Sequence, residues 1–178
     1  YETSTRVTTI SNLRGKIWPT PIIRIFTPSV AKHLEENYRF HQPPHLVLNG
    51  NFAGRKEDRA KTIFSVAATT EGQTDHPFLG EDLPLQNLAA DIVVRGAGIT
   101  VKNLTCATLG GSISGSVFAD VNPGNTTTYK GAMKWDQLSC PLISKTYKFK
   151  EEEKGTLTGS IDFNGNAKGI RSFNANRL

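Results

Sequence analysis

The chain has 178 residues, a net charge of +5 and 37% hydrophobic residues. This length is enough for one domain with its own core, and no apolar run approaches the roughly 18 residues of a membrane-spanning helix. The positive charges are scattered singly instead of being clustered with aromatic residues, which argues against nucleic-acid binding. There is no signal-peptide pattern, and a start at Tyr1 is typical of a processed product or of a segment of a longer protein.

The first 26 residues predict one strand followed by a break. Residues 3–17 are rich in Thr and other β-branched residues, which favours a strand. Residues 18–21 contain two prolines and predict a rigid break, because proline fixes its own φ and biases the preceding residue away from helix. Residues 22–26 form a short apolar run.

One short helix is predicted at about 27–37. Thr27 can cap it, Pro28 suits the first helical position, and Val30, Ala31 and Leu34 share one face. The helix is about three turns long, so we expect it to fill the end or edge of a sheet.

Two strands and two loops follow. Residues 45–52 and 63–69 alternate apolar and other residues and predict strands. We expect loops at 40–44 and at 71–84, where Gly, Pro and Asp are frequent, and a charged turn at 51–59.

Residues 91–121 predict three antiparallel strands and organise the chain. Residues 96–98 supply a short connection, and the alternation slips by one residue at Lys102–Asn103, which is typical of a β-bulge. Gly110 and Gly111 predict the second hairpin turn, because adjacent glycines accept positive φ.

The remaining chain predicts two further strands, at 127–135 and 155–163. Residues 138–149 contain Pro141 and predict a short helix or an irregular crossover. Other expectations are a turn at 122–125, a charged turn at 150–154, a loose segment at 165–169, and a last strand or tail at 170–178.

A short motif recurs along the chain. Residues 111–116 (GSISGS) return 44 residues later as 155–160 (GTLTGS), and 46–52 form a weaker third copy. Either this is a common β pattern, or it marks a repeated unit of an extensible sheet.

The fold class that follows is mainly β. We expect residues 1–178 to form one β-rich domain built on a curled antiparallel sheet, as a β-groove, half-barrel or sandwich.

Three successive runs resemble the C-terminal β-rich region of AsmA-like (AsmA/TamB-type) bacterial envelope proteins. They are 88–94 (LAADIVV), 99–107 (ITVKNLTCA) and 110–115 (GGSISG). Residues 43–50 and 155–165 also resemble this family, so the likeness covers about 30–174. The domain would then be a segment of a longer envelope protein, with 1–29 as an N-terminal strand and linker and 30–178 as the AsmA-like region.

The resemblance implies a long curled sheet with an apolar inner trough. Such proteins are anchored in the inner membrane, project into the periplasm, and are implicated in lipid transport toward the outer membrane. It implies no catalytic residue and no cofactor. The implied partners are a lipid or other hydrophobic ligand and envelope proteins, and the segment itself would not span the membrane.

The candidate lipid-binding residues share one face of consecutive predicted strands. An ordinary dry core is the alternative for the same residues. The candidates are Ile99, Val101, Leu104, Ile113, Val117, Met133, Trp135, Leu157, Ile161 and Phe163.

A second hypothesis is a structural or adhesive β-sandwich module that binds a partner protein or a glycan. Aromatic residues are favoured at interfaces. Its candidate contacts are Tyr1, Trp18, Tyr38 and Tyr147.

An enzyme is the least supported hypothesis. The histidines are His33, His41, His45 and His76, of which His41 and His45 are close enough in sequence to reach one metal. No third ligand is placed, so we predict neither a metal site nor a catalytic residue.

The two cysteines, Cys106 and Cys140, match no zinc pattern. They could form a disulfide or remain as two buried thiols, and the spacing does not decide between these states.

Overall fold

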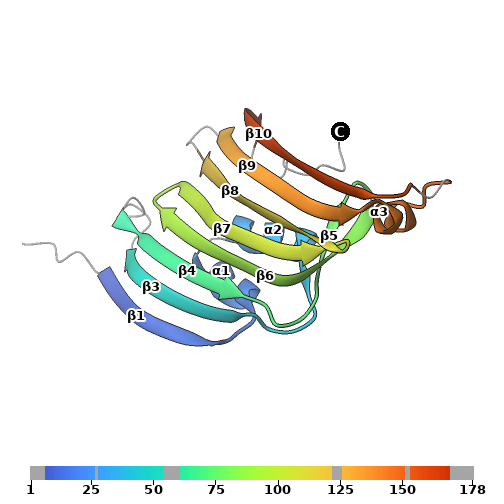
Figure 1. Cartoon of the computed structure of the whole chain (residues 1–178). Helices are drawn as coiled ribbons and strands as arrows, with labels where there is room; N and C mark the ends of the chain where they lie inside the picture. The colour runs from blue at the N-terminus through green and yellow to red at the C-terminus, as the bar shows by residue number, and fades with distance from the viewer. Residues whose placement is uncertain (1–6, 27, 54–60, 122–125, 151–152, 169–178) are drawn as a thin grey trace, which may run out of the picture.

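The computed structural model describes residues 7–26, 28–53, 61–121, 126–150 and 153–168 (Figure 1). Strands predominate, and the helices are short. The elements are β1 (Val7–Lys16), α1 (Pro19–Phe26), α2 (Pro28–Asn37), β2 (Arg39–Phe40), β3 (His45–Ala53), β4 (Ile63–Thr69), β5 (Thr74–Phe78), β6 (Glu81–Arg95), β7 (Gly98–Thr108), β8 (Gly111–Val121), β9 (Thr126–Ser139), α3 (Cys140–Thr146) and β10 (Thr156–Lys168).

The ten strands belong to one antiparallel sheet, whose main path is β1-β3-β4-β6-β7-β8-β9-β10. β5 pairs with the first part of β6, and β2 pairs with β5. Figure 1 shows the strands curving together, with β1 and β10 at opposite edges. The prediction of a mainly β, curled antiparallel sheet is therefore confirmed, and the single open sheet excludes its sandwich version for the part of the chain described.

One face of this sheet is apolar along its whole width. The register aligns a single row of partners across eight strands, and residues two positions away along each strand share its face. We call this side the apolar face and the other side the polar face. The row is Leu13, Leu48, Val66, Ile92, Val101, Val117, Gly131 and Phe163.

The apolar face is covered unevenly. Tyr38, which follows α2, packs on a small core of Leu83, Leu85 and Cys106. The helical hairpin formed by α1 and α2 therefore joins the sheet on this side. At the β3 end Leu48 and Phe52 are only 9% and 5% exposed. In β10, by contrast, Ile161 is 50% exposed. Apart from Leu13 at the β1 edge, which is 44% exposed, the described chain therefore has a covered half toward β3 and an open half toward β10 on one continuous face.

Three short helices form in the described ranges, and one of them was not predicted. α2 (Pro28–Asn37) confirms the expected helix; Thr27 lies outside the described residues. The missed helix is α1, where residues 18–21 were expected to break the chain. Pro19 is the first residue of α1, a position at which the fixed φ of proline favours a helix because no amide hydrogen bond is lost there.

The expected loop at 71–84 is also wrong, because β5 and the start of β6 form a hairpin there. Its turn lies at Leu79 and Gly80, both with positive φ. The sequence did not predict these strands because Pro77 and Pro84 are uncommon inside strands. Both prolines are accommodated in the hairpin, paired with Asp82 and Asp75.

The predicted bulge at Lys102–Asn103 is confirmed. The register between β7 and β8 shifts between Val101 and Leu104, and Asn103 has φ 50°. Asn12 and Gln137, with φ 54° and 56°, lie at similar register shifts in β1 and β9. Bulges increase local twist and bend a strand, which is the physical basis for the curl.

Smaller boundaries differ from expectation. The turn between β7 and β8 is formed by Leu109 and Gly110, one residue earlier than predicted, since Leu109 accepts positive φ. β10 continues to Lys168, so the expected loose segment at 165–169 is wrong up to that residue. The expected helix or crossover within 138–149 is α3. The predictions at 122–125 and 170–178, and parts of those at 3–17, 51–59 and 150–154, lie outside the described residues.

We expect replacement of Asn103 to test the bulge. In Asn103→Val a β-branched residue would occupy the left-handed region, at a cost of about 1–2 kcal/mol in the free energy of unfolding. Asn103→Gly keeps the backbone geometry and loses the 2.7 Å side-chain hydrogen bond to Asp91. Urea unfolding should therefore rank wild type and Asn103→Gly above Asn103→Val; equal stability of the two variants would contradict this account.

Candidate functional site

The ten predicted lipid-binding residues lie together on the apolar face of β7, β8, β9 and β10. Cross-strand pairs such as Val101 with Val117 and Met133 with Ile161 place neighbouring members directly opposite one another. The bulge at Asn103 keeps Leu104 on the same face as Val101, and a second bulge at Gln137 does the same for Leu138 and Trp135. The structure therefore brings the whole candidate set onto one surface.

That surface is shaped by large side chains lying across glycines of the adjacent strand. A Cβ placed on Gly131 would come within 2.5 Å of the Phe163 ring, and one on Gly159 within 2.9 Å of the Trp135 indole. Tyr129 covers Gly165 and Met133 covers Gly115 in the same way. Because each of these glycines leaves room above its strand, the long side chains lie along the sheet instead of projecting from it.

None of the ten candidates is fully buried, so they do not make an ordinary dry core. Eight are half-buried, and Leu157 and Ile161 are exposed, at 46% and 50%. An open depression of about 910 Å³ spans β7 to β10. Most of the residues that line it belong to the opposite face of the sheet, among them Thr105, Ser114 and Lys134. The candidates that border it are Leu104, Val117, Met133 and Ile161.

The opposite face of the same strands is polar. The row Thr105, Ser114, Lys134, Ser160 runs across β7 to β10, and Lys130 lies over the Phe118 ring at 5.7 Å from its centroid. This half of the sheet is therefore amphipathic, with hydroxyl and ammonium groups on one side and hydrocarbon on the other.

The apolar face also extends further than the predicted site. Phe64, Val66, Ile92 and Val94 continue it through β4 and β6, and Tyr129 continues it in β9. Their alternation was visible in the sequence, but the pairing of β4 with β6 across the β5 insertion was needed to show that they adjoin the candidate residues.

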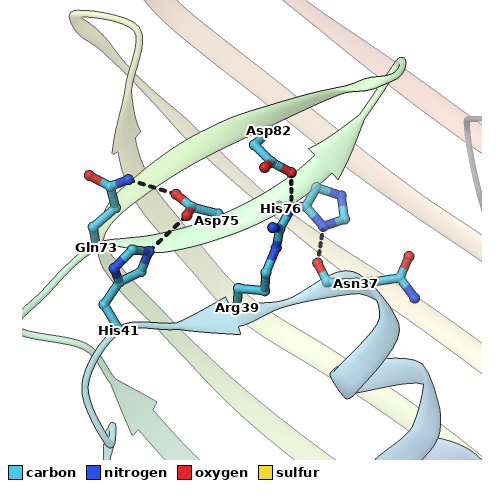
Figure 2. Close-up of polar contacts among 7 residues, drawn as sticks. All are labelled: Asn37, Arg39, His41, Gln73, Asp75, His76 and Asp82. Carbon is cyan, nitrogen blue, oxygen red and sulfur yellow. Dashed lines mark hydrogen bonds and ion pairs between the residues drawn. The ribbon is translucent and has the colours of Figure 1, made fainter.

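A second cluster is polar and lies where β2 meets the β5–β6 hairpin (Figure 2). The His41 Nε2 atom is 2.7 Å from Asp75 Oδ2, and Gln73 Nε2 donates to Asp75 Oδ1 at 2.6 Å. Arg39 forms an ion pair with Asp82. His76 Nδ1 lies 2.8 Å from the carbonyl oxygen of Asn37, at the end of α2.

These contacts attach the helical hairpin to the sheet. The His76 ring also stacks on Tyr38, with centroids 4.8 Å apart, and burial raises the pKa of the Tyr38 hydroxyl, with a further contribution from Cys106. His41 is engaged by Asp75, and no group of three His, Cys, Asp or Glu side chains gathers in the described ranges to hold a metal. The His33 side chain lies outside what the structure describes.

The two cysteines are free thiols. Cys106 is buried, and burial raises its pKa, while a backbone hydrogen bond with Ile113 acts in the opposite direction. A protonated, enclosed thiol of this kind is a packing residue and not a nucleophile.

The aromatic residues proposed for an adhesive interface do not gather. Tyr38 packs into the small core, Tyr147 is half-buried near α3, and Trp18 is exposed just before α1. Tyr1 lies outside the described residues.

Comparisons with protein-family models, with characterised proteins and with solved structures find no match to this chain. None of the helices in the described ranges combines the length and apolar character needed to cross a membrane.

We expect Gly131→Ala to destabilise the sheet by about 1–3 kcal/mol, the usual cost of overpacking. The added methyl group would meet the Phe163 ring at 2.5 Å and the backbone oxygen of Ser116 at 2.6 Å. Ala132→Val, one residue away on the polar face, is the matched control and should unfold within about 0.5 kcal/mol of wild type. Equal urea midpoints for the two variants would count against the close packing over Gly131.

The polar cluster predicts a pH dependence of stability. Burial raises the pKa of Asp75, but hydrogen bonds from His41 and Gln73 and the charges of His41 and Arg39 outweigh it, so the net shift is downward. The stabilisation is therefore complete above the unfolded Asp pKa of about 3.9 and is lost as the pH falls through the lower folded value. Asp75→Asn should remove this loss, worth up to about 1 kcal/mol. Asp82→Asn is the control and should keep it, as urea titrations at several acid pH values would show.

Proposed function

We propose that this chain is a non-catalytic segment of a bacterial envelope protein that binds or guides lipid acyl chains along its apolar face. Its place would be the periplasm, in lipid transport to the outer membrane or in outer-membrane assembly. The parent protein would be anchored in the inner membrane.

One observation carries the proposal: an apolar face that the described part of the chain leaves open. The buried aliphatic, aromatic and cysteine side chains of the described residues are Ala31, Leu48, Phe52, Leu83, Leu85, Cys106 and Leu138, and none of them is one of the ten candidates. Contact between water and an apolar surface of this extent is unfavourable. Such a surface is therefore typical of a site that an apolar ligand or partner covers.

Acyl chains suit this surface physically. Each CH₂ group removed from water contributes about 0.8 kcal/mol, and this interaction is non-directional, so a chain can slide along a continuous face. Large side chains lying flat over glycines give a low-relief surface. Headgroups can remain in water beyond the strand ends.

The resemblance of residues 88–115 to AsmA-like proteins points to the same function. It also supports the absence of a catalytic residue, of a metal and of a cofactor. The alternative, a structural or adhesive module, has weaker support, because its aromatic candidates are dispersed.

The test is displacement of a fluorescent fatty acid from the purified chain, together with native mass spectrometry of bound lipid. We expect binding in the micromolar range and a loss of about tenfold or more in Val117→Glu, because a carboxylate in contact with an acyl chain would have to leave water. Ser116→Glu, on the polar face of the same strand, should bind like wild type.

The controls separate a binding defect from a folding defect. Both variants should keep the circular dichroism spectrum and a thermal midpoint close to wild type. Absence of binding by the folded wild-type chain, or equal binding by Val117→Glu and Ser116→Glu, would refute the proposal.

A further inference from the structure

The segment that follows α2 shields a small core on the apolar face. We call residues Asn37–Phe40 the strap; they are the last residue of α2, Tyr38 and the two residues of β2. Tyr38 packs on Leu83, Leu85 and Cys106, which are only 7%, 6% and 7% exposed. The strap therefore keeps this core from water.

The core under the strap is the direct continuation of the candidate lipid-binding surface. Cys106 lies two residues beyond the candidate Leu104 on the same face of β7, and its register partner on β8 is the candidate Ile113. Leu104 is half-buried, whereas Cys106 is buried. An acyl chain that follows β7 would therefore meet the Tyr38 ring at the point where the open surface ends.

The strap is attached to the sheet by a very short ladder (Figure 2). β2 pairs with β5 through two residues, Arg39 with Asp75 and Phe40 with Thr74. Arg39 also forms an ion pair with Asp82, but both side chains are exposed, and ion pairs of this kind contribute little to stability. Detaching the strap therefore breaks few interactions of the ladder.

Two side chains beneath the strap act in opposite directions. His76 anchors it, because Nδ1 lies 2.8 Å from the Asn37 carbonyl oxygen and the ring stacks on Tyr38 at 4.8 Å. Thr74, the partner of Phe40, is 1% exposed, and its hydroxyl has no hydrogen-bond partner among the described residues. A buried hydroxyl without a partner is unfavourable, so opening of the strap would relieve a cost of the closed state.

Opening need not disturb the main sheet. In chain order α1, α2 and β2 lie between β1 and β3, and these two strands pair directly, from Lys16 with His45 onward. The amide of Ile17 donates to the carbonyl oxygen of Pro44 at 3.1 Å and closes the base of this excursion. The strap can therefore leave β5 while the ladder between β1 and β3 is kept.

We propose that the strap opens as a lid and that an acyl chain then takes the place of Tyr38 on Leu83, Leu85 and Cys106. This inference rests on the proposed function and extends it, because opening lengthens the acyl-binding surface from β7 toward β6. The occupant is an acyl chain because the uncovered core is apolar and continuous with the candidate surface. The binding site thus has an open part and a part that the strap controls.

Thiol labelling without lipid tests the opening. In Cys140→Ser the remaining thiol is Cys106, which reacts with a maleimide only when it is uncovered. We expect a rate that hardly depends on urea below the unfolding transition, because local opening exposes little surface. His76→Ala removes a hydrogen bond and a ring stack and should raise this rate about 5- to 30-fold. Glu71→Gln, which breaks only the exposed ion pair with Lys16, is the control and should leave it unchanged.

A second buried position provides the reference for global unfolding. Leu138 is 7% exposed, like Cys106, but lies outside the core that Tyr38 covers. In a chain with Cys106→Ser and Cys140→Ser, the Leu138→Cys thiol should be labelled at a rate that rises steeply with urea. The same urea dependence for Cys106 and for this thiol, or an unchanged Cys106 rate in His76→Ala, would overturn the opening of the strap.

A disulfide across the ladder tests the occupant. Arg39 and Asp75 are register partners, and such partners lie about 4.5–5.5 Å apart, within the range of a disulfide. Arg39→Cys with Asp75→Cys, in a chain with Cys106→Ser and Cys140→Ser, should hold the strap closed when oxidised and release it when reduced. Each CH₂ group removed from water strengthens binding about fourfold. The gain in affinity from decanoate to octadecanoate should therefore be at least about tenfold larger in the reduced form than in the oxidised form.

The outcomes separate the two proposals. Equal gains in the oxidised and reduced forms, both with the circular dichroism spectrum of wild type, would overturn the acyl chain as the occupant. Failure of both fatty acids to bind either form would refute the proposed function and this occupant together, while Cys106 labelling would still show whether the strap opens. Fatty-acid binding by a chain whose Cys106 is labelled only through global unfolding would overturn the strap and leave the proposed function intact.

Discussion

The packing of large side chains onto glycines of neighbouring strands is the interaction on which the open half of this structure depends. A single-layer sheet exposes two faces, and in the residues that the structure describes no second sheet covers the apolar one. Phe163 on Gly131 and Trp135 on Gly159 let the sheet bury part of its own apolar side chains within a single layer. This partial burial stabilises the layer, and it leaves the outer surface of those side chains available to a ligand.

The two halves of the sheet differ in how their apolar side chains are shielded from water. At the β3 end, large residues such as Leu48 and Phe52 are buried. Near the β5–β6 hairpin the segment after α2 reaches the sheet, and Tyr38 is held there by burial against Leu83 and by stacking on His76. At the β10 end, neither a helix nor a strand of the described chain covers Ile161. The covered half thus provides a stable base from which the open half extends.

The bulges curve the sheet, and the polar cluster around Asp75 fixes which part of it is covered. Residues in the left-handed region at the bulges bend three strands of the sheet, β1, β7 and β9. The ion pairs and hydrogen bonds around Asp75 are mostly exposed, so their contribution to stability is modest, but they fix where β2 and the helical hairpin attach. The position of the covered half follows from that attachment.

The sequence by itself determined the features that depend on neighbours along the chain. Period-two alternation gave the strands and their apolar sides, and the one-residue slip before Leu104 gave the bulge, because both are local consequences of strand geometry. Two predictions that relied on proline were wrong. Pro19 begins a helix where a break was expected, and Pro77 lies within a strand where a loop was expected. Only the tertiary structure decided that β6 pairs with β5 at one end and β4 at the other, that the apolar face spans eight strands, and that Cys106 and Cys140 stay apart as free thiols. These properties depend on pairings between residues distant in sequence, and on which side chains the helical hairpin covers, and no local pattern encodes either.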